Sequence, residues 1–164
     1  DKILVLGYAD WYSPLTLAIT FIHEVRHARQ RFGKEFDNVP ELDPEEFHES
    51  RTWKYQLDIL DAYAGAIWMR AVEEEVKLIT QRYTNRGRSP GEKYFATSGT
   101  AHPSLVQVFG NPTSAYDSNH WHLLLAMRAN FLLAEQANIP DLDTAYANIV
   151  GAYYGWSKRQ VNKT

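Results

Sequence analysis

Apolar residues recur at helical spacing between residues 14 and 32, and no glycine or further proline interrupts the pattern after its first position. Ser13 can cap the N-terminus of such a helix, Pro14 suits its first turn, and Gly33 stands where a helix would stop. Most apolar side chains fall on one broad arc, which we expect to pack into a core: Leu17, Ala18, Ile19, Phe21, Ile22, Val25, Ala28 and Phe32. The remaining polar strip carries two histidines and a glutamate toward a common side.

The rest of the chain is also mostly helical in pattern. Residues 43–83 contain a single glycine and no proline after position 44, so they form one long helix or two. Residues 84–118 are rich in turn-forming residues and predict loops, whereas residues 119–137 and 143–156 predict two closing helices. Lys2–Gly7 is rich in Ile, Leu and Val and predicts a short buried strand.

Length and composition indicate one domain covering residues 1–164, because 164 residues with 45% hydrophobic positions can fill a single core. The predicted fold class is α+β and predominantly helical, with a short N-terminal strand that belongs to a small sheet. The chain begins with Asp1, which suggests a trimmed or matured product, and a larger natural protein with this chain as its catalytic piece is an alternative. Neither the compartment nor the oligomeric state follows from the sequence.

The polar strip contains the most informative feature of the chain, His23-Glu24-Val25-Arg26-His27. Two imidazoles four residues apart lie on one face of a helix, where both can bind a single zinc ion. Zinc lowers the pKa of a bound water to about 7, and a neighbouring carboxylate can take the proton of that water. This pattern is typical of zinc hydrolases, with Glu24 as the general base.

A hydrolytic zinc site needs three protein ligands and one open position, so a third ligand must come from elsewhere. Glu49 is the candidate, because it lies 22 residues after His27, beyond a turn-rich connection and near the start of the next predicted helix, from about residue 43. Two helices joined by such a connection can lie side by side. We therefore expect His23, His27 and Glu49 to bind Zn²⁺.

These residues, with Ala28, Gln30 and the stretch Glu49-Ser50-Arg51-Thr52 and Gln56, resemble the gluzincin branch of the zincin metallopeptidases. The resemblance covers roughly residues 3 to 70 and implies a zincin-like metallopeptidase domain with a metal helix over about 14–32. It implies that His23, His27 and Glu49 hold zinc and that Glu24 is the base. Thr52 departs from the small alanine or the aspartate that is usual three residues after the ligand glutamate.

The resemblance also implies a histidine or tyrosine in the second half of the domain that stabilises the oxyanion. Three candidates are His102, Tyr116 and His120, which lie in or just after the predicted loop region, where specificity residues often occur. No motif selects among them. A peptide or protein substrate is the expected partner.

Other interpretations stay open. The histidines can be a hydrogen-bonded pair in the core. Glu49 belongs to an acidic run that suits any helix N-terminus, and Glu45 and Glu46 are alternative ligands. The domain can also be an inactive zincin-like module that serves in binding or structure.

A di-iron carboxylate protein is a further alternative, because Glu24-Val25-Arg26-His27 and Glu45-Glu46-Phe47-His48 are both Glu-x-x-His motifs. The loop-rich connection between the two motifs leaves little room for the additional ligand-bearing helix that such a bundle requires. Iron in the purified protein would favour this interpretation.

The charge, the apolar runs and the cysteine content limit which partners and metal ligands we expect. The formal net charge of −3 argues against a nucleic-acid partner held by bulk electrostatics. No apolar run is long enough to span a bilayer, so we expect no stable membrane insertion. Because the chain contains no cysteine, any metal must be held by histidine and carboxylate groups.

Overall fold

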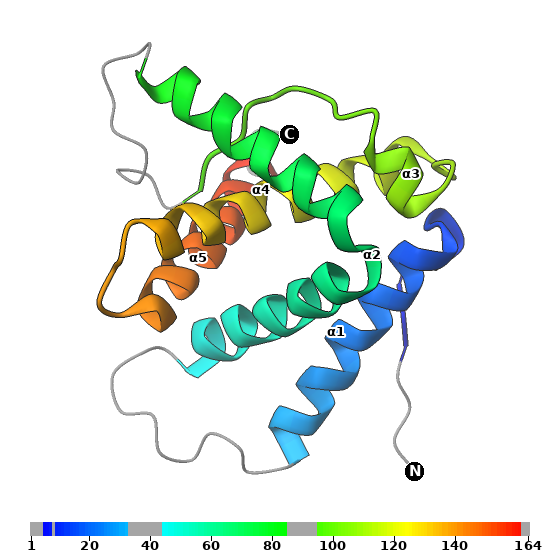
Figure 1. Cartoon of the computed structure of the whole chain (residues 1–164). Coiled ribbons are helices and arrows are strands. Elements are labelled where there is room, and N and C mark those ends of the chain that lie inside the picture. The colour runs from blue at the N-terminus through cyan, green and yellow to red at the C-terminus, as the bar shows by residue number, and fades with distance from the viewer. Residues whose placement is uncertain (1–4, 8, 33–43, 85–94, 162–164) are drawn as a thin grey trace.

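The computed structural model describes residues 5–7, 9–32, 44–84 and 95–161, and within them the protein is predominantly helical. A 3-10 turn at Ala9–Trp11 leads into α1 (Pro14–Phe32), whose bounds match the sequence prediction. The other helices are α2 (Pro44–Thr84), α3 (Leu105–Phe109), α4 (Ala115–Gln136) and α5 (Leu142–Val161). Figure 1 shows α1 alongside the first half of α2.

The expected α+β class is not found in the described residues, which contain helices and no strand. Val5 and Leu6 have no regular secondary structure, and Lys2, Ile3 and Leu4 lie outside the described residues. Apolar β-forming composition predicted the strand, but a strand needs a neighbouring strand for its backbone hydrogen bonds, and none is present in the part of the chain described.

The long helix α2 is two helices joined at Gly65. Gly65 has φ 58° and ψ −135°, a conformation that side chains other than glycine rarely adopt. Figure 1 shows α2 changing direction sharply at this point. The only glycine of the stretch thus decides between the two interpretations that the sequence left open.

The main core joins all five helices. Its largest fully buried side chains come from α1, both halves of α2, α3 and α4: Ile19, Leu57, Leu60, Trp68, Leu105, Trp121, Leu124, Leu125, Met127 and Phe131. Helices α2, α4 and α5 contact one another, and α1 packs chiefly on α2. Residues 84–118 were expected to be loop, but they contain a short helix, α3, whose Leu105 and Phe109 are buried.

The buried side of α1 combines positions of the polar strip with part of the apolar arc. Thr16 and His23 are buried together with Ile19, whereas Phe21 of the expected core arc is 49% exposed. The polar groups are buried because they have partners: Trp121 Nε1 donates to Thr16 Oγ1 at 2.7 Å, and His23 bonds to α2. The expectation that the apolar arc faces the core is wrong at Phe21.

Asp117 joins the N-terminal ends of α1 and α4. Its buried carboxylate accepts hydrogen bonds from the backbone N–H groups of Ser13 and Thr113, each 3.1 Å away, and from Trp121 Nε1 at 3.0 Å. Burial raises the pKa of Asp117, but these hydrogen bonds outweigh it and hold the pKa below its usual value.

Asp117→Ala is expected to lower the free energy of unfolding by about 3 kcal/mol at pH 7, because it removes the carboxylate acceptor of the Ser13 and Thr113 backbone N–H groups, while Trp121 Nε1 keeps only Thr16 Oγ1. Since the folded-state pKa is depressed, the contribution of Asp117 is present above its unfolded pKa, near 3.9, and is lost as the pH falls through the folded value. Urea unfolding of both proteins at pH 7 and pH 3 checks this. A difference that does not shrink in acid would contradict it.

Candidate metal centre

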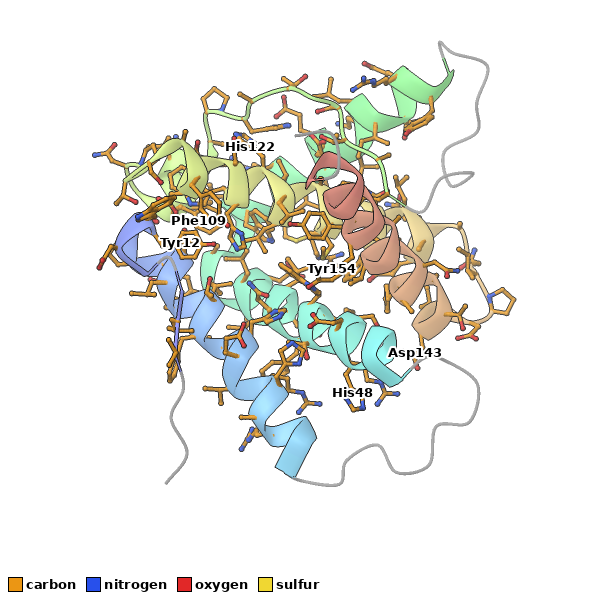
Figure 2. The ribbon with its side chains drawn as sticks, turned by 180° about the vertical axis from the view of Figure 1, so that it is seen from behind. Tyr12, His48, Phe109, His122, Asp143 and Tyr154 are labelled. Atoms are coloured by element: carbon orange, nitrogen blue, oxygen red, sulfur yellow. The ribbon has the colours of Figure 1, made fainter. Side chains whose placement is uncertain are left out.

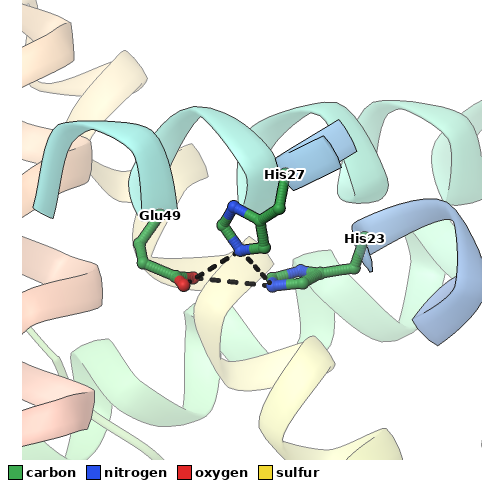
Figure 3. Close-up of side chains that lie close together, drawn as sticks. All are labelled: His23, His27 and Glu49. Atoms are coloured by element: carbon green, nitrogen blue, oxygen red, sulfur yellow. Dashed lines mark hydrogen bonds and ion pairs between the residues drawn. The ribbon is translucent and has the colours of Figure 1, made fainter. Parts of the chain in front are cut away.

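Three side chains from two helices meet at one point on the inner side of α1. His23 and His27 come from consecutive turns of α1, and Glu49 comes from the second turn of α2 (Figure 3). One ligand atom from each lies within 4.8 Å of the others. Within the described ranges, this is the only group of three or more such side chains with spacing suited to a metal ion.

The distances show how closely the three converge. His27 Nε2 lies 3.1 Å from His23 Nε2 and 2.9 Å from Glu49 Oε1, and His23 Nε2 lies 3.5 Å from Glu49 Oε2. Burial raises the pKa of the Glu49 carboxyl, but its contacts with His23 and His27 outweigh burial, and the pKa lies well below its usual range. Glu49 is therefore a carboxylate at neutral pH, as a metal ligand must be.

Each histidine is oriented by a group on α2. Gln56 is almost fully buried, and its Oε1 lies 2.9 Å from His23 Nδ1. Because an amide oxygen only accepts, His23 Nδ1 carries the proton, and Nε2 is left with its lone pair toward His27 and Glu49. This is the tautomer that a metal ligand requires.

Thr52 on α2 lies beside His27. Its hydroxyl donates to the backbone oxygen of His48 at 2.8 Å, and the same oxygen lies 3.5 Å from His27 Nδ1. Gln56 and Thr52 thus lie at the Nδ1 sides of the two rings, and the Nε2 atoms of both histidines face Glu49.

Gln56→Leu keeps the size of the side chain but removes the acceptor for His23, so we expect zinc affinity to fall about 10–100-fold. The exposed Gln107 on α3 provides a matched control, because Gln107→Leu should leave the affinity unchanged. Competition with a fluorescent zinc chelator measures both variants. Equal affinity in the parent and in Gln56→Leu would show that the hydrogen bond does not support the ligand.

Helix α5 adds a residue that sequence analysis missed. The Tyr154 hydroxyl donates to Glu49 Oε2 at 3.0 Å and accepts from Trp53 Nε1 at 3.3 Å. Burial and the nearby Glu49 charge raise the pKa of Tyr154 well above its usual value, so the phenol stays protonated. Tyr154 lies 105 residues after Glu49, and no local pattern connects the two.

Glu24, the expected general base, is half-buried on α1 between the two histidines in sequence. No hydrogen bond or ion pair involves it among the residues that the structure describes. Its carboxylate is therefore free to bind a water or a substrate group. Glu45 and Glu46, the alternative ligands, have side chains outside the described set.

The three expected oxyanion donors have different surroundings. His102 is buried, and its Nε2 lies 2.6 Å from Glu75 Oε2, which also accepts from the Ser98 hydroxyl. This pair fixes residues 98–102 onto the second half of α2. Tyr116 is 43% exposed and packs against Trp11. Neither belongs to the group around Glu49.

His120 is the candidate that borders the metal centre. Its ring lies 6.3 Å from the ring of Trp53, which itself packs edge-on against His23 at 4.8 Å. Its Nε2 is buried and has no hydrogen-bond partner among the residues that the structure describes. Burial, together with the nearby His23, lowers the pKa of His120 to about 4, so the ring is neutral at pH 7.

Comparisons of the chain with protein-family models, with curated protein sequences and with solved structures found no significant match. The geometry of the site and the chemistry of its donors therefore carry the functional argument. None of the helices in the described ranges is both long and apolar enough to cross a membrane.

Proposed function

We propose that this domain is a gluzincin-like, zinc-dependent hydrolase that cleaves a peptide or amide bond. The observation that carries the proposal is the convergence of His23, His27 and Glu49 on one point. Two imidazole nitrogens and one carboxylate are a common catalytic zinc donor set, and three protein ligands leave one position open. The hydrogen bond from His23 to Gln56 supports it further, because it leaves the Nε2 atom of His23 unprotonated.

Bound zinc supplies Lewis acidity, which acidifies water and polarises the carbonyl of a substrate. Glu24 takes a proton from the attacking water and returns it to the leaving amine, as expected for a carboxylate beside the ligand histidines. His120 is the preferred oxyanion donor, because its buried Nε2 has no partner and its ring borders the centre through Trp53. We propose no such role for His102, which is occupied by Glu75.

The donor set also favours zinc over a di-iron centre. Di-iron bundles use four carboxylates with two histidines, whereas the described group contains two histidines and one carboxylate. His48, from the second Glu-x-x-His motif, is absent from the group.

Metal analysis of the purified protein, combined with a peptide-library digest read by mass spectrometry, tests the proposal. We expect about one zinc per chain and cleavage that stops with a chelator and returns with zinc. Zinc without cleavage of any peptide would instead indicate a binding or structural module. Iron in place of zinc would favour the di-iron alternative.

A further inference from the structure

We propose that Tyr154 makes Glu49 a one-oxygen ligand of the metal and thereby keeps one coordination position free for water. This inference rests on the proposed function, because it concerns the same centre. It assigns a positioning role to the C-terminal helix α5, which contributes no ligand. Figure 2 shows Tyr154 between α5 and the first half of α2.

The two oxygens of Glu49 have different surroundings. Oε1 faces His27 Nε2 at 2.9 Å, whereas Oε2 accepts the Tyr154 hydrogen bond at 3.0 Å. Oε2 also lies 3.5 Å from His23 Nε2, which is longer than a good hydrogen bond. The carboxylate therefore presents Oε1 to His27, whereas Oε2, the oxygen nearer to His23, is held by Tyr154 from α5.

Tyr154 can hold Oε2 because its own orientation is fixed. Trp53 Nε1 donates to the phenol oxygen at 3.3 Å, so the single phenol hydrogen is directed to Glu49. Trp53 is buried and packs edge-on against His23 with ring centroids 4.8 Å apart. The ring of Tyr154 also packs against that of Tyr153 at 5.3 Å. Neighbouring groups thus constrain both the position of the phenol and the direction of its donor.

The number of carboxylate oxygens on the metal decides whether water can bind in a four-coordinate site. A glutamate can ligate through one oxygen or through both. With two histidines present, a second oxygen would occupy the fourth position that a hydrolytic site leaves open. A hydrogen bond to Oε2 opposes that second contact, because it withdraws electron density from Oε2 and holds this oxygen toward α5.

Tyr154→Phe tests the inference with cobalt(II) in place of zinc, because the visible absorption of cobalt reports the ligands that surround it. Phenylalanine keeps the ring and its packing and removes only the hydroxyl. We expect the parent to show the bands of four-coordinate cobalt with one bound water and the variant to show shifted bands, because the second Glu49 oxygen replaces that water. Cobalt affinity should also fall by about 10–100-fold in the variant.

Tyr146→Phe is the matched control. It removes a phenol from the same helix, and that phenol donates at 2.8 Å to Glu135, which is not part of the metal group. The control should keep the cobalt spectrum of the parent. If Tyr154→Phe does not fold, Trp53→Phe is the second variant. It keeps the Tyr154 phenol but removes the indole N–H that donates to it, and it should shift the cobalt bands in the same direction by a smaller amount.

The outcomes separate this inference from the proposed function. Bound cobalt with the same spectrum in the parent and in Tyr154→Phe would overturn the role of Tyr154 and leave the metal centre intact. Failure of the parent to bind either cobalt or zinc would overturn both. An equal spectral change in Tyr146→Phe would mean that any phenol lost from α5 disturbs the site, which would also overturn the specific role.

Discussion

Glu24→Gln is expected to lower kcat by about 10²–10⁴-fold, the usual contribution of a general base, while leaving zinc bound. Glutamine keeps the size of the side chain but cannot take a proton from water. Zinc binding should persist because the three converging ligand groups are His23, His27 and Glu49, and Glu24 is not one of them. The measurements are kcat on a cleaved library peptide and the zinc content of the purified variant.

Glu73→Gln on α2 is the control for Glu24→Gln, because Glu73 is an exposed glutamate outside the metal group. It should keep both the activity and the zinc of the parent. A Glu24→Gln variant that retains turnover within a factor of ten would exclude Glu24 as the base. Loss of zinc from that variant would instead make Glu24 part of the binding site.

His23→Ala and Glu49→Ala are each expected to weaken zinc binding far beyond the roughly 10–100-fold that loss of a supporting residue costs. Each change removes one of three donors, and the two that remain cannot complete the site. Zinc at about 100 times its dissociation constant should stabilise the parent by about 2.7 kcal/mol, and this gain should disappear in both variants. Thermal unfolding with and without zinc measures it.

Glu74→Ala is the control for Glu49→Ala, since Glu74 is exposed on the second half of α2 and belongs to no metal group in the described chain. It should gain as much stability from zinc as the parent does. If Glu49→Ala also keeps the full gain, the third ligand is another residue. If His23→Ala keeps it, the centre proposed here does not bind the metal.

The Glu75–His102 pair shows why residue type alone could not select among the candidate oxyanion donors. His102 and His120 both lie in the region that the sequence marked for an oxyanion donor, and no motif separates them. The structure places His102 against a buried carboxylate and leaves His120 with a buried, unpartnered nitrogen beside Trp53. Only the tertiary packing distinguishes the imidazole of His102, which pairs with Glu75, from that of His120.

The group of His23, His27 and Glu49 was predictable because the sequence patterns that indicate it are mostly local. Residues 14–32 form a helix from their own periodicity and end signals, and the four-residue spacing of His23 and His27 then places both rings on one face. Gln56 could have been assigned from the same logic, because it follows Glu49 by seven residues, or two helical turns, and so shares its face.

The sequence by itself predicted the four long helices, the two-histidine turn and the candidacy of Glu49, because hydrogen bonding and side-chain spacing within a helix depend on neighbours only a few residues away. The tertiary structure alone decided which face of α1 is buried and that Tyr154 reaches Glu49 from α5. Both depend on groups more than a hundred residues apart, such as Thr16 with Trp121, whose meeting is set by how whole helices pack.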